Sequence, residues 1–200
     1  METALLARHA ESELSVRGLT NGDPRVPCGL TEHGRAQAQR LGELLAPTPI
    51  ELCVESEFQR AQETADIALA GRDVPRLVLA ELNDIGFGEF EGRPLVEYRA
   101  WARAHGPEAP VPGGRESRAA AIKRYIKAFR SILARPEETI LVVTHSLPIR
   151  YVLNAAAGRQ PAPALEQVPY AEPFRLDAAE LESAVERLET WAAQPAWGPT

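Results

Sequence analysis

Two kinds of apolar segment alternate along the chain. Short apolar runs, which are typical of buried strands, occur at 4–7, 50–54, 77–79 and 139–144, with a weaker one at 174–176. Longer segments with apolar residues on one helical face lie at 31–46, 56–71, 117–134, 146–157 and 181–192. Strands that alternate with helices predict an α/β fold in three layers, with a mostly parallel sheet covered on both faces.

Two stretches break this alternation. Residues 12–29 contain several glycines and prolines and predict a long loop. Residues 83–114 are also rich in glycine and proline, with a short helix predicted over 94–105, where basic residues interleave with Tyr98 and Trp101. We therefore expect one domain over 1–200 with an irregular, substrate-facing insertion at about 83–117.

Composition narrows the range of functions. The 200 residues are 44% hydrophobic, which is enough for one sizeable core, and the net charge of -6 disfavours nucleic acid or an anionic membrane as a partner. The first residues lack the apolar core of a signal peptide, and no apolar run approaches the length of a membrane span, so we expect a cytoplasmic protein. The pattern does not distinguish a monomer from a homodimer.

Polar residues with chemical potential follow the predicted strands. Arg8 and His9 follow the first strand, Arg60 lies in the opening turn of the helix after the second, Asp84 follows the third, and His145 follows the fourth. Because the carboxyl ends of parallel strands meet at one edge of a sheet, these side chains are expected to share a crevice. Helix N-termini after Ser56 and Ser146 are expected to add backbone N–H donors there.

This combination of residue types predicts a phosphate pocket. Two guanidinium groups can bind phosphate oxygens, a neutral imidazole can attack phosphorus, and a carboxylic acid can protonate the leaving oxygen. His9, Glu11, Asp84 and His145 are also metal-ligating residue types, but two adjacent arginines would repel a cation. We therefore expect neither a metal nor any other cofactor.

Five motifs in order give the sequence a family resemblance. They are LARHAES at 6–12, LTEHGRAQA at 30–38, SEFQRAQETA at 56–65, FGEFEG at 87–92 and VTHS at 143–146. In these motifs the chain resembles the histidine phosphatase superfamily, the phosphoglycerate mutase-like proteins, in its branch of small phosphatases. The resemblance implies a phosphoglycerate mutase-like α/β/α sandwich.

The resemblance also implies roles for individual residues. His9 would become a phosphohistidine, and Arg8, Arg60 and His145 would hold the phosphate. Asp84 stands where the family usually has glutamate as the proton donor, and Glu81 is the alternative donor.

Other positions also depart from the family pattern. Ser15 replaces a frequent asparagine, Ser146 and Leu147 replace two frequent glycines, and Ala10 replaces the signature glycine. Ser15 and Ser146 are still expected near the phosphate. None of these changes removes an indispensable group.

The expected function is metal-independent hydrolysis of a small phosphomonoester through a phosphohistidine intermediate on His9. Two alternatives remain open at this point. One is a phosphoglycerate mutase-type phosphotransferase, although the short 93–117 segment favours a site that water can reach. The other is a phosphate-binding protein of low activity on the same fold. The sequence does not identify the substrate beyond a small phosphorylated molecule.

Overall fold

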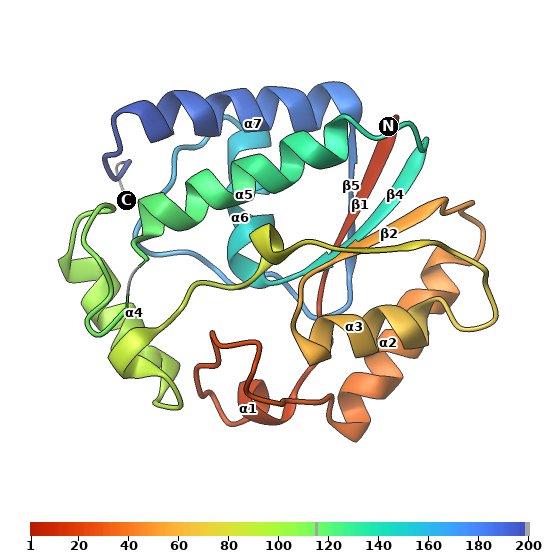
Figure 1. Cartoon of the computed structure of the whole chain (residues 1–200), viewed down its shortest axis with the longest axis horizontal. Coiled ribbons are helices and arrows are strands. Elements are labelled where there is room, and N and C mark those ends of the chain that lie inside the picture. The colour runs from red at the N-terminus through yellow and green to blue at the C-terminus, as the bar shows by residue number, and fades with distance from the viewer. Residues whose placement is uncertain (115, 199–200) are drawn as a thin grey trace.

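A five-stranded sheet with the strand order β3-β2-β4-β1-β5 forms the centre of the computed structural model, which describes residues 1–114 and 116–198 (Figure 1). The four parallel strands are β1 (Thr3–Arg8), β2 (Leu52–Glu55), β3 (Arg76–Val78) and β4 (Thr139–Thr144). The fifth, β5 (Pro173–Asp177), pairs antiparallel with β1. The predicted α/β fold with a mostly parallel sheet is confirmed.

Alternate residues of the central strands point to opposite faces of the sheet, and each face carries its own apolar core. On β1, Leu5 and Ala7 pack in one core, whereas Ala4 and Leu6 pack in the other. This two-sided burial explains why the strand reads as a continuous apolar run rather than as an alternating one.

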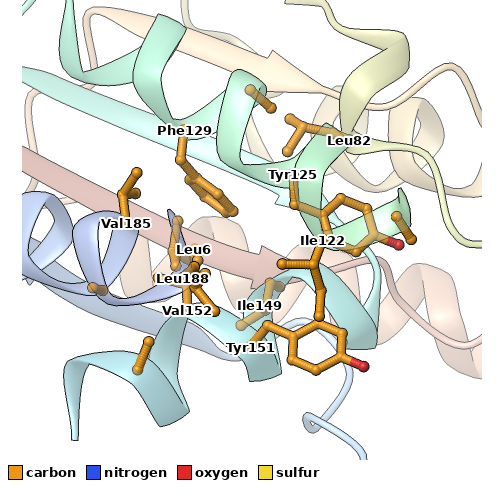
Figure 2. Close-up of a cluster of buried hydrophobic side chains, with 14 of the residues drawn as sticks. Leu6, Leu82, Ile122, Tyr125, Phe129, Ile149, Tyr151, Val152, Val185 and Leu188 are labelled. Atoms are coloured by element: carbon orange, nitrogen blue, oxygen red, sulfur yellow. The ribbon is translucent and has the colours of Figure 1, made fainter. Parts of the chain in front are cut away.

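Helices cover both faces (Figure 1). On one face lie α2 (Glu32–Leu45) and α3 (Gln59–Ala68), and on the other α5 (Arg118–Leu133), α6 (Ser146–Ala156) and α7 (Ala178–Ala193). Figure 2 shows Leu6 of β1 among side chains of the second group, including Phe129 of α5, Val152 of α6 and Val185 of α7. None of the helices in the described ranges is long and apolar enough to span a membrane.

Two helix predictions were wrong in detail. A short helix, α1 (Glu13–Val16), lies in the predicted loop 12–29, and its four residues are too few to show an apolar period. The helix after β2 starts at Gln59, with Phe58 as its N-terminal flanking residue, instead of being capped by Ser56. Ser56 is fully buried, and its hydroxyl group bonds the ring of His145 instead.

The insertion at about 83–117 contains a 3-10 turn at Gly88–Phe90 and the predicted helix, α4 (Leu95–Ala104). Residue 115 of this segment is outside the described residues. The insertion is joined to the loop after β1, because Leu95 N donates to Gly18 O at 2.8 Å and Leu19 pairs with Pro94. These two irregular segments therefore stand together at the carboxyl edge of the sheet and form walls there.

Candidate active site

A cavity opens at the carboxyl ends of β1 and β4. The predicted site residues that line it are Arg8, His9, Ser15, Arg60, Asp84 and Ser146. His145 lies directly behind this lining and is fully buried, whereas Glu81 does not line the cavity. The fold thus brings together residues that are far apart in the sequence.

His9 continues the hydrogen bonding of β1 beyond the strand, since its backbone N–H donates to Thr144 O at 2.8 Å. Its ring Nδ1 lies 2.7 Å from the carbonyl oxygen of Ala10. Because a carbonyl oxygen only accepts, we assign the ring proton to Nδ1. Nε2 then carries the free electron pair, and Arg60 Nε donates to it at 3.2 Å. Nε2 is therefore the ring atom whose lone pair faces the cavity side of Arg60.

The environment keeps the His9 imidazole neutral. Burial lowers the pKa of His9 well below its ordinary value, and the positive charges of Arg60 and Arg8 lower it further. Both causes act against the charged form, since desolvation and like charge each disfavour imidazolium. A neutral imidazole is the form that can attack an electrophile.

The guanidinium of Arg60 is held from several sides. Its Nη1 donates to Asn21 Oδ1, its Nη2 donates to Asn21 O at 3.0 Å, and its Cζ lies 4.1 Å from the centroid of the Phe58 ring. Asn21 also lines the cavity. Sequence reasoning missed this residue, because an asparagine before a glycine at 21–22 reads as an ordinary turn.

Arg8 is held by a segment near the C-terminal end of the sequence. Its Nη1 donates to Val168 O at 2.8 Å, and its Cζ lies 3.8 Å from the centroid of the Tyr170 ring. The contact arises because Ala171 N donates to Arg8 O at 3.0 Å, which brings residues 168–171 beside the end of β1. Val168 and Tyr170 were also missed, and we find no sequence signal that would have identified them.

His145 is placed to orient Arg60. Arg60 Nη2 lies 3.2 Å from His145 Nδ1, and because a guanidinium only donates, Nδ1 is the acceptor. The proton is then on Nε2, which donates to Ser56 Oγ at 2.9 Å. Burial, followed by the charge of Arg60, lowers the pKa of His145 well below its ordinary value. His145 is thus neutral, and both of its ring nitrogens are hydrogen-bonded.

Asp84 lines the same cavity as Arg8 and Arg60. Its Oδ1 accepts from Ile85 N at 3.0 Å, and its Oδ2 lies 3.9 Å from His145 Nδ1. Burial raises the pKa of Asp84, although Arg60 and Arg8 oppose this shift. A carboxyl group with a raised pKa retains a proton that it can give to a leaving group.

The two predicted serines already have local partners. Ser15 Oγ donates to Ser12 O at 2.9 Å and accepts from Ser12 N at 2.8 Å, so this hydroxyl group braces the short helix α1. Ser146 Oγ accepts from Val168 N at 2.9 Å. Ser146 is the first residue of α6, so the free N–H groups of that helix start at the cavity.

The arrangement suits an anion better than a cation. Within residues 1–114 and 116–198, no group of three or more His, Cys, Asp or Glu side chains is arranged to hold a metal ion. Glu11, which the sequence offered as a ligand type, accepts a hydrogen bond from Thr31 Oγ1 at 2.7 Å and does not line the cavity. The cavity instead combines guanidinium groups with the start of a helix, which together attract phosphate.

Comparison with known proteins identifies the family. The model of the histidine phosphatase superfamily (branch 1) matches residues 4–193. The adenosylcobalamin/α-ribazole phosphatase of Salmonella typhimurium is 34% identical over 149 residues, which cover 70% of this chain and 72% of that protein. The α-ribazole phosphatase structure from Shigella flexneri matches with a TM-score of 0.73 and 27% identity, over 88% of this chain and 90% of that one.

A mutase is also among the relatives. The 2,3-bisphosphoglycerate-dependent phosphoglycerate mutase 2 of Gloeobacter violaceus is 29% identical over 167 residues, which cover 76% of this chain and 74% of that protein. The resemblance inferred from the five sequence motifs is confirmed. The chain belongs to branch 1 of the histidine phosphatase superfamily and is a phosphatase of that family.

Proposed function

We propose that this phosphatase hydrolyses a small phosphomonoester in two steps, through a phosphohistidine at His9 Nε2. The observation that carries the proposal is the state of the His9 ring. Its Nδ1 is tied to the Ala10 carbonyl oxygen at 2.7 Å, and its neutral Nε2 is next to Arg60 in the cavity. An imidazole fixed in this tautomer presents one lone pair to a phosphorus atom.

In the first step the phosphate lies between Arg8 and Arg60. The hydrogen bond from Arg60 Nε moves from His9 Nε2 to a phosphate oxygen, which frees the lone pair. Nε2 then forms a bond to phosphorus while the bond from phosphorus to the ester oxygen breaks, and Asp84 gives its proton to that oxygen. The guanidinium groups stabilise the charge on the transferring phosphoryl group.

The second step reverses the role of Asp84. Its carboxylate takes a proton from a water molecule, whose oxygen bonds to phosphorus as the bond from phosphorus to Nε2 breaks. Inorganic phosphate leaves, and His9 returns to its neutral form. His145 keeps Arg60 aligned in both steps. Ser15 of α1 and Ser146, the first residue of α6, lie beside the phosphate.

The relatives suggest which substrates to assay first. Two of them are named for α-ribazole phosphate. The outer cavity wall is partly apolar, with Leu14, Leu19, Leu95, Leu147 and Leu165, and would suit an organic leaving group. The similarity to a phosphoglycerate mutase keeps phosphoryl transfer to a hydroxyl group as the second candidate. Isomerisation of 3-phosphoglycerate with 2,3-bisphosphoglycerate, without release of phosphate, would identify that activity.

The intermediate can be trapped directly. A ³²P-labelled phosphomonoester is mixed with the enzyme, the reaction is quenched during turnover, and the label on protein is followed in acid and in base. We expect a label that is lost in acid and retained in base, and no label in His9→Ala. His33→Ala is the matched control, because His33 is exposed on α2. Label that persists in His9→Ala would contradict the proposal.

A further inference from the structure

The cavity carries more positive charge than one phosphate group needs. Among the described residues its lining has six arginines, of which Arg99, Arg103, Arg118 and Arg150 are not needed for the transferred phosphate. The lining carboxyl groups are those of Asp84 and Glu166. This excess of positive charge is confined to the cavity, since the whole chain has a net charge of -6. Uncompensated charges of one sign in a cleft attract a ligand of the other sign.

Arg118 is the most enclosed of these extra arginines. It is the first residue of α5, and only 5% of its surface is exposed. Its Nε donates to Tyr151 Oη at 2.6 Å, while its Nη2 is buried without a hydrogen-bond partner among the described residues. Among the described residues, the ion pairs made by α5 are those of Arg124 and Arg130, so no carboxylate is paired with Arg118. Burying an unpaired charge is costly, so a counter-charge brought by a ligand would stabilise this group.

Aromatic rings surround the Arg118 guanidinium. Its Cζ lies 5.4 Å from the Tyr151 ring centroid and 5.5 Å from the Trp197 ring centroid. The Tyr151 ring belongs to the core between α5 and α6, while its hydroxyl group points out of that core (Figure 2). These contacts fix the position of Arg118 at the cavity wall but supply no negative charge.

A second unpartnered group lies in the same wall. Tyr98 of α4 also lines the cavity, and its Oη is buried without a hydrogen-bond partner among the described residues. Burial raises the pKa of Tyr98 to about 12, so the phenol is a neutral hydrogen-bond donor. Arg118 and Tyr98 are neighbours, and each acts on the pKa of the other, but neither Arg118 Nη2 nor Tyr98 Oη makes a hydrogen bond of good geometry within the described residues. Both groups can therefore donate to a ligand in the cavity.

This donor group lies in the same cavity as the phosphate site, on the side of Asp84. The charges that lower the pKa of His9 are those of Arg60 and Arg8, whereas the charge of Asp84, the proposed donor to the leaving group, acts on Tyr98. Arg99 lies between the two regions: it is on the cavity face of α4, and its charge acts on Arg8. Burial and the positive charge of the neighbouring Arg103 lower the pKa of Arg99, so two like charges stand close together in this part of the lining.

We infer that the substrate carries a second anionic group on its leaving-group side, a carboxylate or a second phosphate, bound by Arg118 and Tyr98 and attracted by Arg99. The inference rests on the proposed phosphatase reaction and names a substrate class for it. Apart from Asp84, Glu166 is the carboxylate that lines the cavity among the described residues, and its side chain is exposed. Its backbone oxygen accepts a hydrogen bond from Arg150 Nε at 3.0 Å.

Matched pairs of substrates test the inference with the whole chain. One pair is 3-phosphoglycerate and glycerol 3-phosphate, which differ in a carboxylate against a hydroxymethyl group. The longer pair is 4-carboxyphenyl phosphate and 4-carbamoylphenyl phosphate, which differ in charge at nearly equal size. We expect kcat/KM to be about tenfold higher or more for the carboxylate in at least one pair, as for a hydrogen bond between charged partners. Equal kcat/KM within both pairs would overturn the inference.

Variants then assign the preference to the residues. Arg118→Gln should bring the ratio within the preferred pair close to one, whereas Lys123→Gln, which removes an exposed charge from the same helix, should keep it. If Arg118→Gln does not fold, Arg118→Lys and Arg99→Gln replace it, and each should lower the ratio. A ratio that is unchanged in every folded variant would refute the assignment, and a purely structural role of Arg118 would lower the melting temperature without changing the ratio.

The two proposals fail in different ways. Hydrolysis of 4-nitrophenyl phosphate is measured beside each pair. If this compound is hydrolysed through a phosphohistidine but neither pair shows a preference, the inference about the second anion fails alone. If no phosphomonoester is hydrolysed, the proposed reaction fails, and the inference that rests on it fails with it.

Discussion

Replacement of Asp84 by asparagine tests the proposed proton donor while leaving the phosphate-binding groups in place. The change keeps the size of the side chain but removes the acidic proton. Asp84 lies at the cavity with 18% of its side chain exposed, and burial raises its pKa, so the native group is suited to donate. A positioned general acid accelerates a reaction by about 10²–10⁴-fold, which corresponds to about 3–5 kcal/mol of barrier.

The size of the loss should depend on the leaving group. An alkoxide is a poor leaving group without a proton, so kcat for an alkyl phosphate should fall by about 10²-fold or more in Asp84→Asn. 4-Nitrophenolate leaves readily as an anion, so the loss with 4-nitrophenyl phosphate should be much smaller. Phosphate release is measured for both substrates, and trapping of the phosphoenzyme shows which step becomes slow.

Glu81→Gln is the matched control for this experiment. It is the same carboxyl-to-amide change three residues away, at the alternative donor, whose side chain does not line the cavity. The Glu81 carbonyl oxygen accepts from Arg124 Nη1 at 2.9 Å, and the substitution leaves this backbone contact in place. We expect little change in kcat for either substrate. Equal losses on both substrates in Asp84→Asn, or a larger loss in Glu81→Gln, would refute the reasoning.

Three further predictions concern pH, phosphate binding and stability. Because burial lowers the pKa of His145, the unfolded chain binds a proton that the folded chain excludes below about pH 6.5. As the pH is lowered from about 6.5 to 5, this group should therefore reduce the free energy of unfolding by up to about 1 kcal/mol per pH unit. Urea unfolding at several pH values should show a shallower pH dependence in His145→Gln and an unchanged one in His33→Gln. Asn21→Ala removes a side-chain acceptor from Arg60 and should raise the inhibition constant of inorganic phosphate about tenfold; an unchanged constant would show that Asn21 does not orient Arg60. Gly34→Ala would place a Cβ 2.0 Å from the backbone oxygen of residue 11. We expect it to lower the free energy of unfolding by about 2 kcal/mol, whereas alanine in place of glycine in a helix usually raises it by about 1 kcal/mol.

Several features of the fold followed from local pattern. The run at 139–144 predicted a central strand because β4 is buried on both faces, which requires apolar residues at every position. The helical period over 117–134 predicted α5, with Ile122 and Phe129 in the core. The start of α3 was predicted less well, because Ser56 satisfies the usual preference at a helix N-terminus yet its hydroxyl group is used by His145 across the sheet.

The site shows the same division between local and long-range information. His9, Arg8, Arg60 and Asp84 could be named in advance, because each follows a strand within a few residues, at the carboxyl edge of the sheet. Asn21 could not, since its contact with Arg60 spans 39 residues and depends on how the loop after β1 folds.

The sequence by itself determined the α/β architecture, the phosphate chemistry and the family, since these depend on periodicity, residue type and short motifs. Only the tertiary structure decided which nitrogen of His9 is free, that Asp84 rather than Glu81 lines the cavity, and that Arg118 Nη2 is buried without a hydrogen-bond partner among the described residues. The physical reason is that hydrogen bonding, burial and pKa shifts depend on neighbours that distant segments supply. Arg8 shows this directly, because its partners at 168–170 come from the far end of the chain.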